Sequence, residues 1–204
     1  MEARTTLRAE RMLPAERYAQ LLAVAEQLFV ERGFTSVSMT DIAAAAGVTR
    51  PVVYDHFKSK EGAYLACVGQ ARASFEQELL RQIRPELPPR EQLRAGGEAF
   101  FATLEGDPAR WQLLFGSNAV LPGEANQTLA AMRFATIEQI RLILVAIAPD
   151  APAERIEACA HVVSGAGERL GHWWLTRPEI PRERIVDHYI DILWDGLRPY
   201  IRDA

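Results

Sequence analysis

The chain has 204 residues, of which 49% are hydrophobic and 25% charged, with a formal net charge of −4; this is the composition of a folded globular protein rather than a disordered one. Its longest apolar run, residues 142–148, is too short to span a membrane, and the first thirty residues lack the apolar stretch of a secretory signal. Two cysteines, Cys67 and Cys159, supply neither a disulfide framework nor a zinc site, so we expect a cytoplasmic protein.

The apolar residues recur at helical spacing throughout the chain, and no segment keeps the alternation of a strand. Gly33, the prolines at 85, 88 and 89, and the Pro-Gly and Pro-Asp pairs further on mark the breaks between segments. We therefore predict an all-α fold of about nine helices. They are expected at residues 15–32, 39–46, 50–56, 60–83, 90–104, 108–117, 124–147, 153–175 and 181–201.

Residues 38–60, which read SMTDIAAAAGVTRPVVYDHFKSK, predict two short helices joined by a tight turn. Ser38 and Asp41 have the spacing of a capping box, and Gly47 suits the left-handed position that ends a helix. Thr49 is expected to cap the next helix with its side chain, and Pro51 fits the first turn. Two helices joined in this way form a helix-turn-helix, whose second helix enters the DNA major groove.

The second helix carries side chains suited to DNA. Arg50 can form a bidentate bond to guanine, and Thr49 can meet a base edge or a phosphate. Lys60 stands at the start of the next helix, where its ammonium and the helix N-terminus can converge on one phosphate. Val53 and Phe57 are expected to face inward. The predicted DNA contacts are Ser38, Thr49, Arg50, Pro51, Tyr54, His56 and Lys60.

Charge by itself is ambiguous, because residues 1–60 carry a net charge of +1 and the rest of the chain −5. Charges further than about 10 Å from a phosphate are largely screened, so the overall acidity does not exclude DNA. A helix–glycine–helix pair also occurs in proteins that bind no DNA. The caps, the exposed polar residues and Lys60 together favour DNA binding.

The same segment resembles the signature of the tetracycline-repressor (TetR) family of transcriptional regulators. The resemblance covers the first third of the chain, in Gly33-Phe34, DIA at 41–43, AGVT at 46–49, VYDHF at 53–57 and SKE at 59–61. It implies a homodimer with a DNA-binding domain at residues 1–58 and a helical ligand-binding and dimerisation domain at residues 59–204. It also implies operator contacts at the matching Thr49, Arg50, Tyr54, His56 and Lys60. Pro51 departs from the family, which often has glycine there.

One DNA-binding domain carries few basic residues, and phosphate contacts supply much of the affinity for DNA, so a single domain is expected to bind weakly. Two such domains about 34–36 Å apart, one turn of the DNA helix, are therefore needed. Residues 1–13 carry three arginines that could reach the minor groove, although a frayed tail is the favoured interpretation. The last two helices have wide apolar seams that favour a four-helix bundle across a two-fold axis over a monomer. The predicted interface comprises Ile156, Ala160, Val163, Gly167, Leu170, Trp174, Ile185, Tyr189, Ile192 and Gly196.

The middle helices carry aromatic residues with a few polar ones among them, a mixture typical of ligand pockets although also of plain core. The predicted ligand contacts are Phe100, Phe101, Trp111, Phe115, Asn118, Arg133, Phe134, His161 and Trp173. This lining suggests a hydrophobic or aromatic effector. The family resemblance implies that the effector would wedge these helices apart and change the spacing of the two DNA-binding domains.

Catalysis is disfavoured, because the chain has no phosphate-binding glycine loop and no nucleophile elbow. His161 and His172 lie about 16 Å apart along one helix, too far to share a metal, and His188 has no third ligand nearby. We expect no cofactor and no metal. The predicted function is a ligand-responsive regulator, in particular a repressor, that binds a palindromic operator as a homodimer; the alternative is a helical ligand-binding or interaction module that does not bind DNA.

Overall fold

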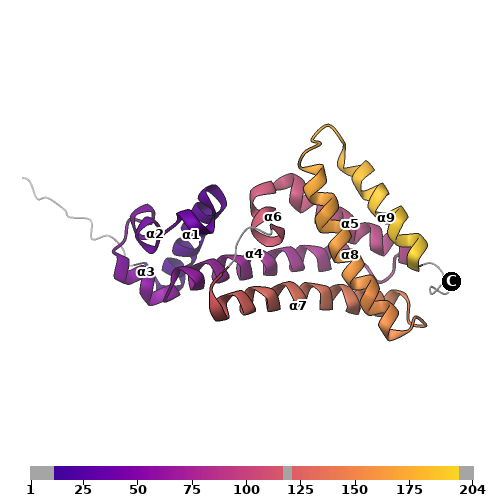
Figure 1. Cartoon of the computed structure of the whole chain (residues 1–204), viewed down its shortest axis with the longest axis horizontal. Helices are drawn as coiled ribbons and strands as arrows, with labels where there is room; N and C mark the ends of the chain where they lie inside the picture. Colours follow the sequence, from indigo (N-terminus) through magenta and orange to yellow (C-terminus); the bar gives the residue numbers. More distant parts are fainter. Residues whose placement is uncertain (1–11, 117–120, 198–204) are drawn as a thin grey trace, which may run out of the picture. The chain divides into compact units, whose positions relative to one another are not determined.

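The structure is a computed structural model and describes residues 12–116 and 121–197. Within these residues the chain is helical and forms nine helices, which confirms the predicted all-α class (Figure 1). None of the helices described is long and apolar enough to cross a membrane. Residues 1–11 of the N-terminal arm and Asn118 lie outside the described residues.

The helix boundaries fall within a few residues of the predicted ones. One difference is at Gly33, which was expected to end the first helix. Its φ of 74° does break the helical geometry, but the chain resumes a last turn to Ser36. The helices are α1 (Pro14–Ser36), α2 (Met39–Ala45), α3 (Arg50–Phe57), α4 (Lys60–Gln82), α5 (Pro89–Gly106), α6 (Pro108–Phe115), α7 (Gly123–Ile147), α8 (Ala153–Trp174) and α9 (Arg182–Leu197).

The chain divides into two compact units between Cys67 and Val68, inside α4 rather than before it. We call the first unit the head and the second the body. The head includes the start of α4 because Tyr64 packs edge-on against Phe29 and Phe34, with ring centroids 5.2 Å apart in both pairs. The first two turns of α4 therefore complete the hydrophobic core of the head.

Cys67 is fully buried in that core, where its Sγ lies 3.7 Å from the carbonyl oxygen of Leu22. Burial raises the pKa of the Cys67 thiol to about 12, so its thiolate fraction at pH 8 is on the order of 10⁻⁴. We expect a thiol reagent at pH 8 to label the half-buried Cys159 and to leave Cys67 unlabelled until the protein unfolds. Mass spectrometry of native and denatured samples would check this, and equal labelling rates at both cysteines would contradict it.

The body packs its helices in pairs, with α5 along α9 and α7 along α8. Its interior holds large apolar side chains such as Phe101, Leu104 and Trp111, all fully buried or nearly so. Gly171 allows α8 to pack closely against Trp111 of α6, because a Cβ at this position would lie 2.6 Å from the indole ring.

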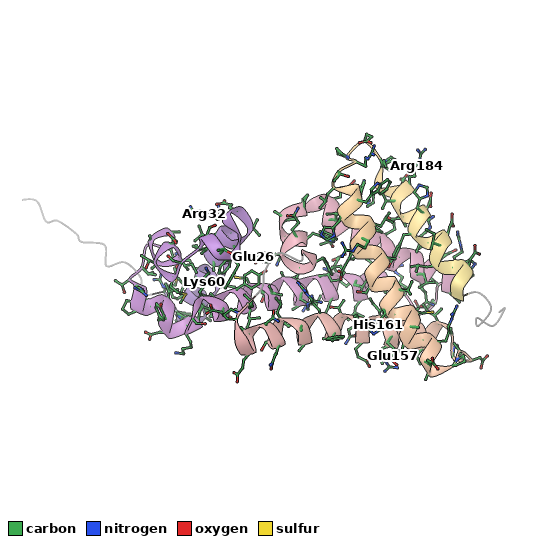
Figure 2. All side chains as sticks on the ribbon, viewed as in Figure 1. Glu26, Arg32, Lys60, Glu157, His161 and Arg184 are labelled. Carbon is green, nitrogen blue, oxygen red and sulfur yellow. The ribbon has the colours of Figure 1, made fainter. Side chains whose placement is uncertain are left out.

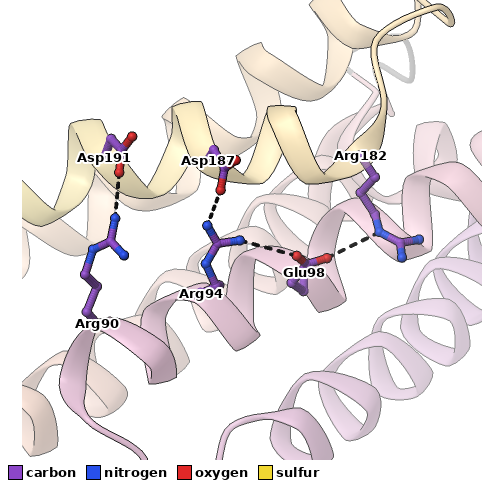
Figure 3. Close-up of polar contacts among 6 residues, drawn as sticks. All are labelled: Arg90, Arg94, Glu98, Arg182, Asp187 and Asp191. Carbon is purple, nitrogen blue, oxygen red and sulfur yellow. Dashed lines mark hydrogen bonds and ion pairs between the residues drawn. The ribbon is translucent and has the colours of Figure 1, made fainter.

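A row of ion pairs fixes α9 on α5 (Figure 3). Asp191 accepts a hydrogen bond from Arg90 at 2.7 Å, and Asp187 accepts one from Arg94. Glu98 on α5 lies 3.3 Å from Arg182 at the start of α9. These groups are partly exposed, so each pair contributes at most about 1 kcal/mol. Their joint effect is to fix the register of α9 along α5.

Candidate nucleic-acid interface and ligand cavity

Helix α2 begins with the predicted capping box. The Asp41 N–H donates to Ser38 Oγ at 3.2 Å, and the Ser38 N–H donates to Asp41 Oδ2 at 2.8 Å. Hydrogen bonds from Ser38 hold the pKa of Asp41 below its ordinary value. The turn that follows has Gly47 at φ 66°, in the left-handed region. The helix-turn-helix thus forms as predicted, and the Ser38 hydroxyl is engaged in the cap.

The start of α3 differs from the prediction, because the Thr49 side chain makes no capping hydrogen bond. A capping side chain bonds to the N–H of the second or third helical residue. Pro51 at the second position has no N–H, and the Val52 N–H already donates to the Thr49 carbonyl oxygen at 3.1 Å. The Thr49 hydroxyl therefore remains exposed and is not committed to the helix.

Arg50 and Tyr54 form one exposed unit on α3. Arg50 Nη2 donates to the Tyr54 hydroxyl at 2.9 Å, and the guanidinium carbon lies 5.1 Å from the centre of the Tyr54 ring. A guanidinium stacked on an aromatic ring is held in few orientations. Tyr54 therefore orients Arg50, in addition to the phosphate contact that the sequence predicts for it.

His56 and Lys60 have more neighbours than the sequence indicates. His56 is half-buried, with its ring centroid 6.0 Å from that of Tyr18 on α1. Lys60, at the first position of α4 (Figure 2), donates from Nζ to the Thr35 carbonyl oxygen at 3.1 Å and lies 4.3 Å from the centre of the Phe34 ring. A phosphate bound by Lys60 would have to compete with this carbonyl oxygen.

Four of the seven predicted DNA contacts line one hollow of the head, namely Ser38, Arg50, Tyr54 and Lys60. Thr49, Pro51 and His56 do not line it, although Thr49 and Pro51 are exposed nearby on α3. Sequence reasoning missed other polar residues that line the hollow. The signal was their position around the starts of α2 and α4, where polar residues gather at helix N-termini. These are Thr35, Ser36, Thr40, Ser59 and Glu61.

The corner between α3 and α4 keeps the recognition helix α3 in place. Val53 and Phe57 face inward as predicted, with 0% and 5% of their surfaces exposed. Gly62, in the first turn of α4, lies so close to this corner that a Cβ would be 2.2 Å from the backbone carbonyl oxygen of Phe57. Sequence reasoning did not single out Gly62, because nothing local distinguishes it from other helical glycines.

The body contains an apolar cavity bounded by helices α4 to α9, with about 700 Å³ of space that protein atoms do not fill, its open mouth included. Phe75 and Leu79 line it from α4, and Ile83 lines it just after α4 ends. Two predicted ligand contacts, Phe100 and Phe115, also line it.

The other described ligand candidates do not line this cavity. Phe101 and Trp111 are fully buried core residues. Arg133 is exposed and donates to the Gly116 carbonyl oxygen at 3.2 Å. Three other candidates for the pocket lining are exposed to solvent. These are Phe134, His161 and Trp173 (His161 is labelled in Figure 2). The helical period shows which residues share a face, but it does not show what that face contacts.

Most residues of the predicted dimer seam pack inside the body of the single chain. Each carries an apolar side chain, or a glycine, that the neighbouring helices of the same chain cover. The buried members are Ile156, Ala160, Gly167, Trp174, Ile185 and Tyr189. Val163 and Leu170 are partly buried, and Ile192 is 73% exposed. Gly196 lies outside the residues whose burial the structure describes.

An apolar surface does lie on α8 and α9, and it includes Leu170, Tyr189 and Ile192 of the predicted seam. Val162, Trp173 and Ile192 are exposed by 57%, 42% and 73%. A shallow hollow on this surface is lined by Ala166, Arg169, Leu170, Trp173, Tyr189 and Ile192. We call this surface the α8–α9 face.

A helix-turn-helix head followed by an all-helical body is the architecture of helix-turn-helix transcriptional regulators. Residues 21–67 match the bacterial regulatory proteins of the tetR family, and residues 89–196 match the tetracyclin repressor-like C-terminal domain. The chain therefore belongs to the TetR family of transcriptional regulators, which are not enzymes.

The similarity to known relatives extends over nearly the whole chain. The transcriptional activator FasR of Mycolicibacterium smegmatis is 32% identical over 191 residues, which are 93% of this chain and 87% of that protein. A TetR-like regulator from Rhodococcus sp. RHA1 has a TM-score of 0.72 at 28% identity, covering 92% of this chain and 99% of its own. AibR, solved with isovaleryl coenzyme A and operator DNA, has the same fold, with a TM-score of 0.66 at 22% identity, covering 87% of this chain and 97% of its own.

Proposed function

We propose that this protein is a ligand-responsive transcriptional regulator that binds a palindromic operator as a homodimer. The observation that carries the proposal is the exposed N-terminal part of α3, where Thr49, Arg50 and Tyr54 stand free of the core. In a helix-turn-helix this end of the recognition helix lies nearest the base edges. Arg50 is the base-reading residue, and Thr49, Tyr54, His56 and Lys60 contact phosphate or sugar.

A dimer supplies the affinity that one head lacks. The head offers few cations to phosphate, and phosphate contacts dominate protein–DNA affinity. Two linked heads bind their half-sites together, so the second contact is intramolecular and the affinity rises without new contacts per head. The α8–α9 face supports such a dimer, because it exposes Trp173 and Ile192 beside a hollow that a second copy could fill.

The cavity supports regulation by an effector. Its α4 wall, formed by Phe75 and Leu79, belongs to the same continuous helix that contributes Tyr64 and Cys67 to the head core. An effector that moves this wall would change the spacing of the two heads and therefore operator occupancy. AibR has this fold and was solved with a small-molecule ligand and operator DNA.

The proposal concerns operator occupancy, which serves repression and activation alike. A repressor was expected from the sequence, whereas FasR, a relative that matches over most of its length, is an activator. A reporter gene under the operator, measured with and without the protein, decides the direction of regulation.

The DNA-binding proposal is tested by gel shift with the promoter region beside the gene, across a salt series. We expect Arg50→Ala to relax base preference at one position by about 1–3 kcal/mol. Lys60→Ala should weaken binding to every sequence alike and make the salt dependence shallower. Tyr54→Ala should resemble Arg50→Ala in part, because the ring orients the guanidinium.

Lys58→Ala is a control that should leave base preference unchanged, since Lys58 does not line the hollow and its Nζ already donates to the Asp55 carbonyl oxygen. Absence of DNA binding by the wild-type protein at low salt would overturn the proposal and favour a helical ligand-binding module. Unchanged base preference in Arg50→Ala would remove the base-reading role of Arg50.

A further inference from the structure

A buried guanidinium in the body has no partner for two of its nitrogens. Arg72 on α4 is 6% exposed, and its Nε and Nη1 have no hydrogen-bond partner among the described residues. Burial lowers the pKa of Arg72, and the nearby charges of Glu76 and Glu168 only partly offset this effect. Buried arginine side chains are normally paired, because an unpaired buried charge destabilises the fold. Hydrogen-bond acceptors for these two nitrogens are therefore what Arg72 lacks, and a carboxylate supplies two such oxygens.

Arg72 does not itself line the apolar cavity but lies one helical turn before its first α4 residue, Phe75. On α4 it precedes Phe75 and Leu79 at steps of three and four residues, which places the three side chains on one face of the helix, and Ile83 follows just after the end of α4 at a further step of four. Phe75, Leu79 and Ile83 line the cavity, and from Phe75 to Ile83 this row extends roughly 12 Å. Arg72 continues the row by one turn, at the end of the cavity nearest Phe75.

A second unpartnered polar group lies at the cavity wall. Thr136 on α7 is 6% exposed and lines the cavity, and its Oγ1 has no hydrogen-bond partner in the described part of the chain. Arg133, whose charge acts on Arg72, lies one turn before Thr136 on the same helix. Glu168, which also acts on Arg72, directly follows the cavity residue Gly167 on α8. Three helices thus bring Arg72 and Thr136 to the same end of the cavity.

We propose that the effector is an amphipathic organic acid, whose elongated apolar body lies along Phe75, Leu79 and Ile83 and whose carboxylate pairs with Arg72 and accepts a hydrogen bond from Thr136. This inference rests on the proposed function, since it names the ligand class of the proposed effector cavity. A carboxylate carries one negative charge and neutralises one guanidinium. A phosphate dianion would leave excess negative charge beside Glu76 and Glu168 in apolar surroundings, so the carboxylate is the better match.

Calorimetry on the full chain with two probes of equal chain length tests the proposal, with dodecanoate as the acid and dodecan-1-ol as its uncharged analogue. We expect the wild-type protein to bind dodecanoate at least about tenfold more tightly than dodecan-1-ol. Arg72→Met should abolish this preference, because dodecanoate affinity falls while dodecan-1-ol affinity is kept. Dodecyl phosphate should bind more weakly than dodecanoate.

Arg81→Met is the matched control, since Arg81 is on the same helix with its side chain 74% exposed and does not line the cavity. It should keep the wild-type preference. Thr136→Val is a second variant that keeps the charge, and it should weaken dodecanoate binding several-fold with dodecan-1-ol unchanged. Thermal unfolding of each variant shows that the fold is kept.

The proposal is overturned if wild-type protein does not prefer dodecanoate, or if Arg72→Met retains the preference. Neither measurement involves DNA, so the proposed ligand class and the proposed regulatory function can be refuted independently of each other. A protein that binds dodecanoate through Arg72 but never shifts operator DNA would retain this inference and lose the proposed function.

Discussion

Gly62→Ala is expected to weaken operator binding strongly although it alters no residue that faces DNA. The added Cβ would lie 2.2 Å from the Phe57 carbonyl oxygen, and a backbone atom cannot move aside as the end of a flexible side chain can. Either α3 shifts away from α4 or the first turn of α4 unwinds. Overpacking of this kind costs about 1–3 kcal/mol, and a displaced recognition helix loses its base contacts as well. We expect DNA affinity to fall by roughly a hundredfold.

Gly69→Ala is the matched control on the same helix, because a Cβ there would be 3.8 Å from Met132 Cε, an ordinary contact. It should be neutral or slightly stabilising, as alanine favours a helix over glycine. DNA titration and thermal unfolding of both variants make the comparison. Wild-type affinity and melting temperature in Gly62→Ala would show that the corner does not position α3.

Ile192→Glu is expected to convert a dimer into monomers. Ile192 is 73% exposed and sits beside the hollow on the α8–α9 face, so the substitution is tolerated by a single chain. In a symmetric dimer it places two carboxylates in an apolar interface, and an unpaired buried charge costs several kcal/mol. Because each monomer then binds only one half-site, operator affinity should fall by roughly a hundredfold or more.

Sedimentation velocity and gel shift on the same samples measure both effects. Val145→Glu serves as the control, since Val145 is an apolar residue of α7 with 43% exposure that does not line the α8–α9 face. It should remain dimeric and bind DNA as the wild type does. A dimer that survives Ile192→Glu would place the interface elsewhere, and a monomeric wild type would refute the dimer itself.

The head could be predicted closely because its signals are local. The pair Ser38 and Asp41 lies three residues apart, and Gly47 fixes a turn by its own backbone. The cap expected from Thr49 was wrong for an equally local reason, the missing N–H of Pro51. What local pattern could not supply was Gly62, whose role arises from contact with Phe57 across a corner.

The body was harder, because an apolar helix face does not say which partner covers it. Ile185 and Ile192 belong to one predicted seam, yet the first is fully buried by its own chain and the second is 73% exposed. The aromatic residues predicted to contact a ligand differ in the same way, since Phe100 lines the cavity whereas Phe134 is exposed to solvent. Arg72 escaped notice because a lone arginine on a helix is usually solvated, and only its burial reveals it.

The division of the chain inside α4 determines where proteolysis can separate a stable DNA-binding fragment. Cleavage at residue 58 would remove Tyr64 and Cys67, and the aromatic rings of Phe29 and Phe34 would then face water. Such a fragment would bind hydrophobic dyes and be digested further. A fragment that ends beyond Cys67 retains these contacts and is the one that limited digestion should leave intact.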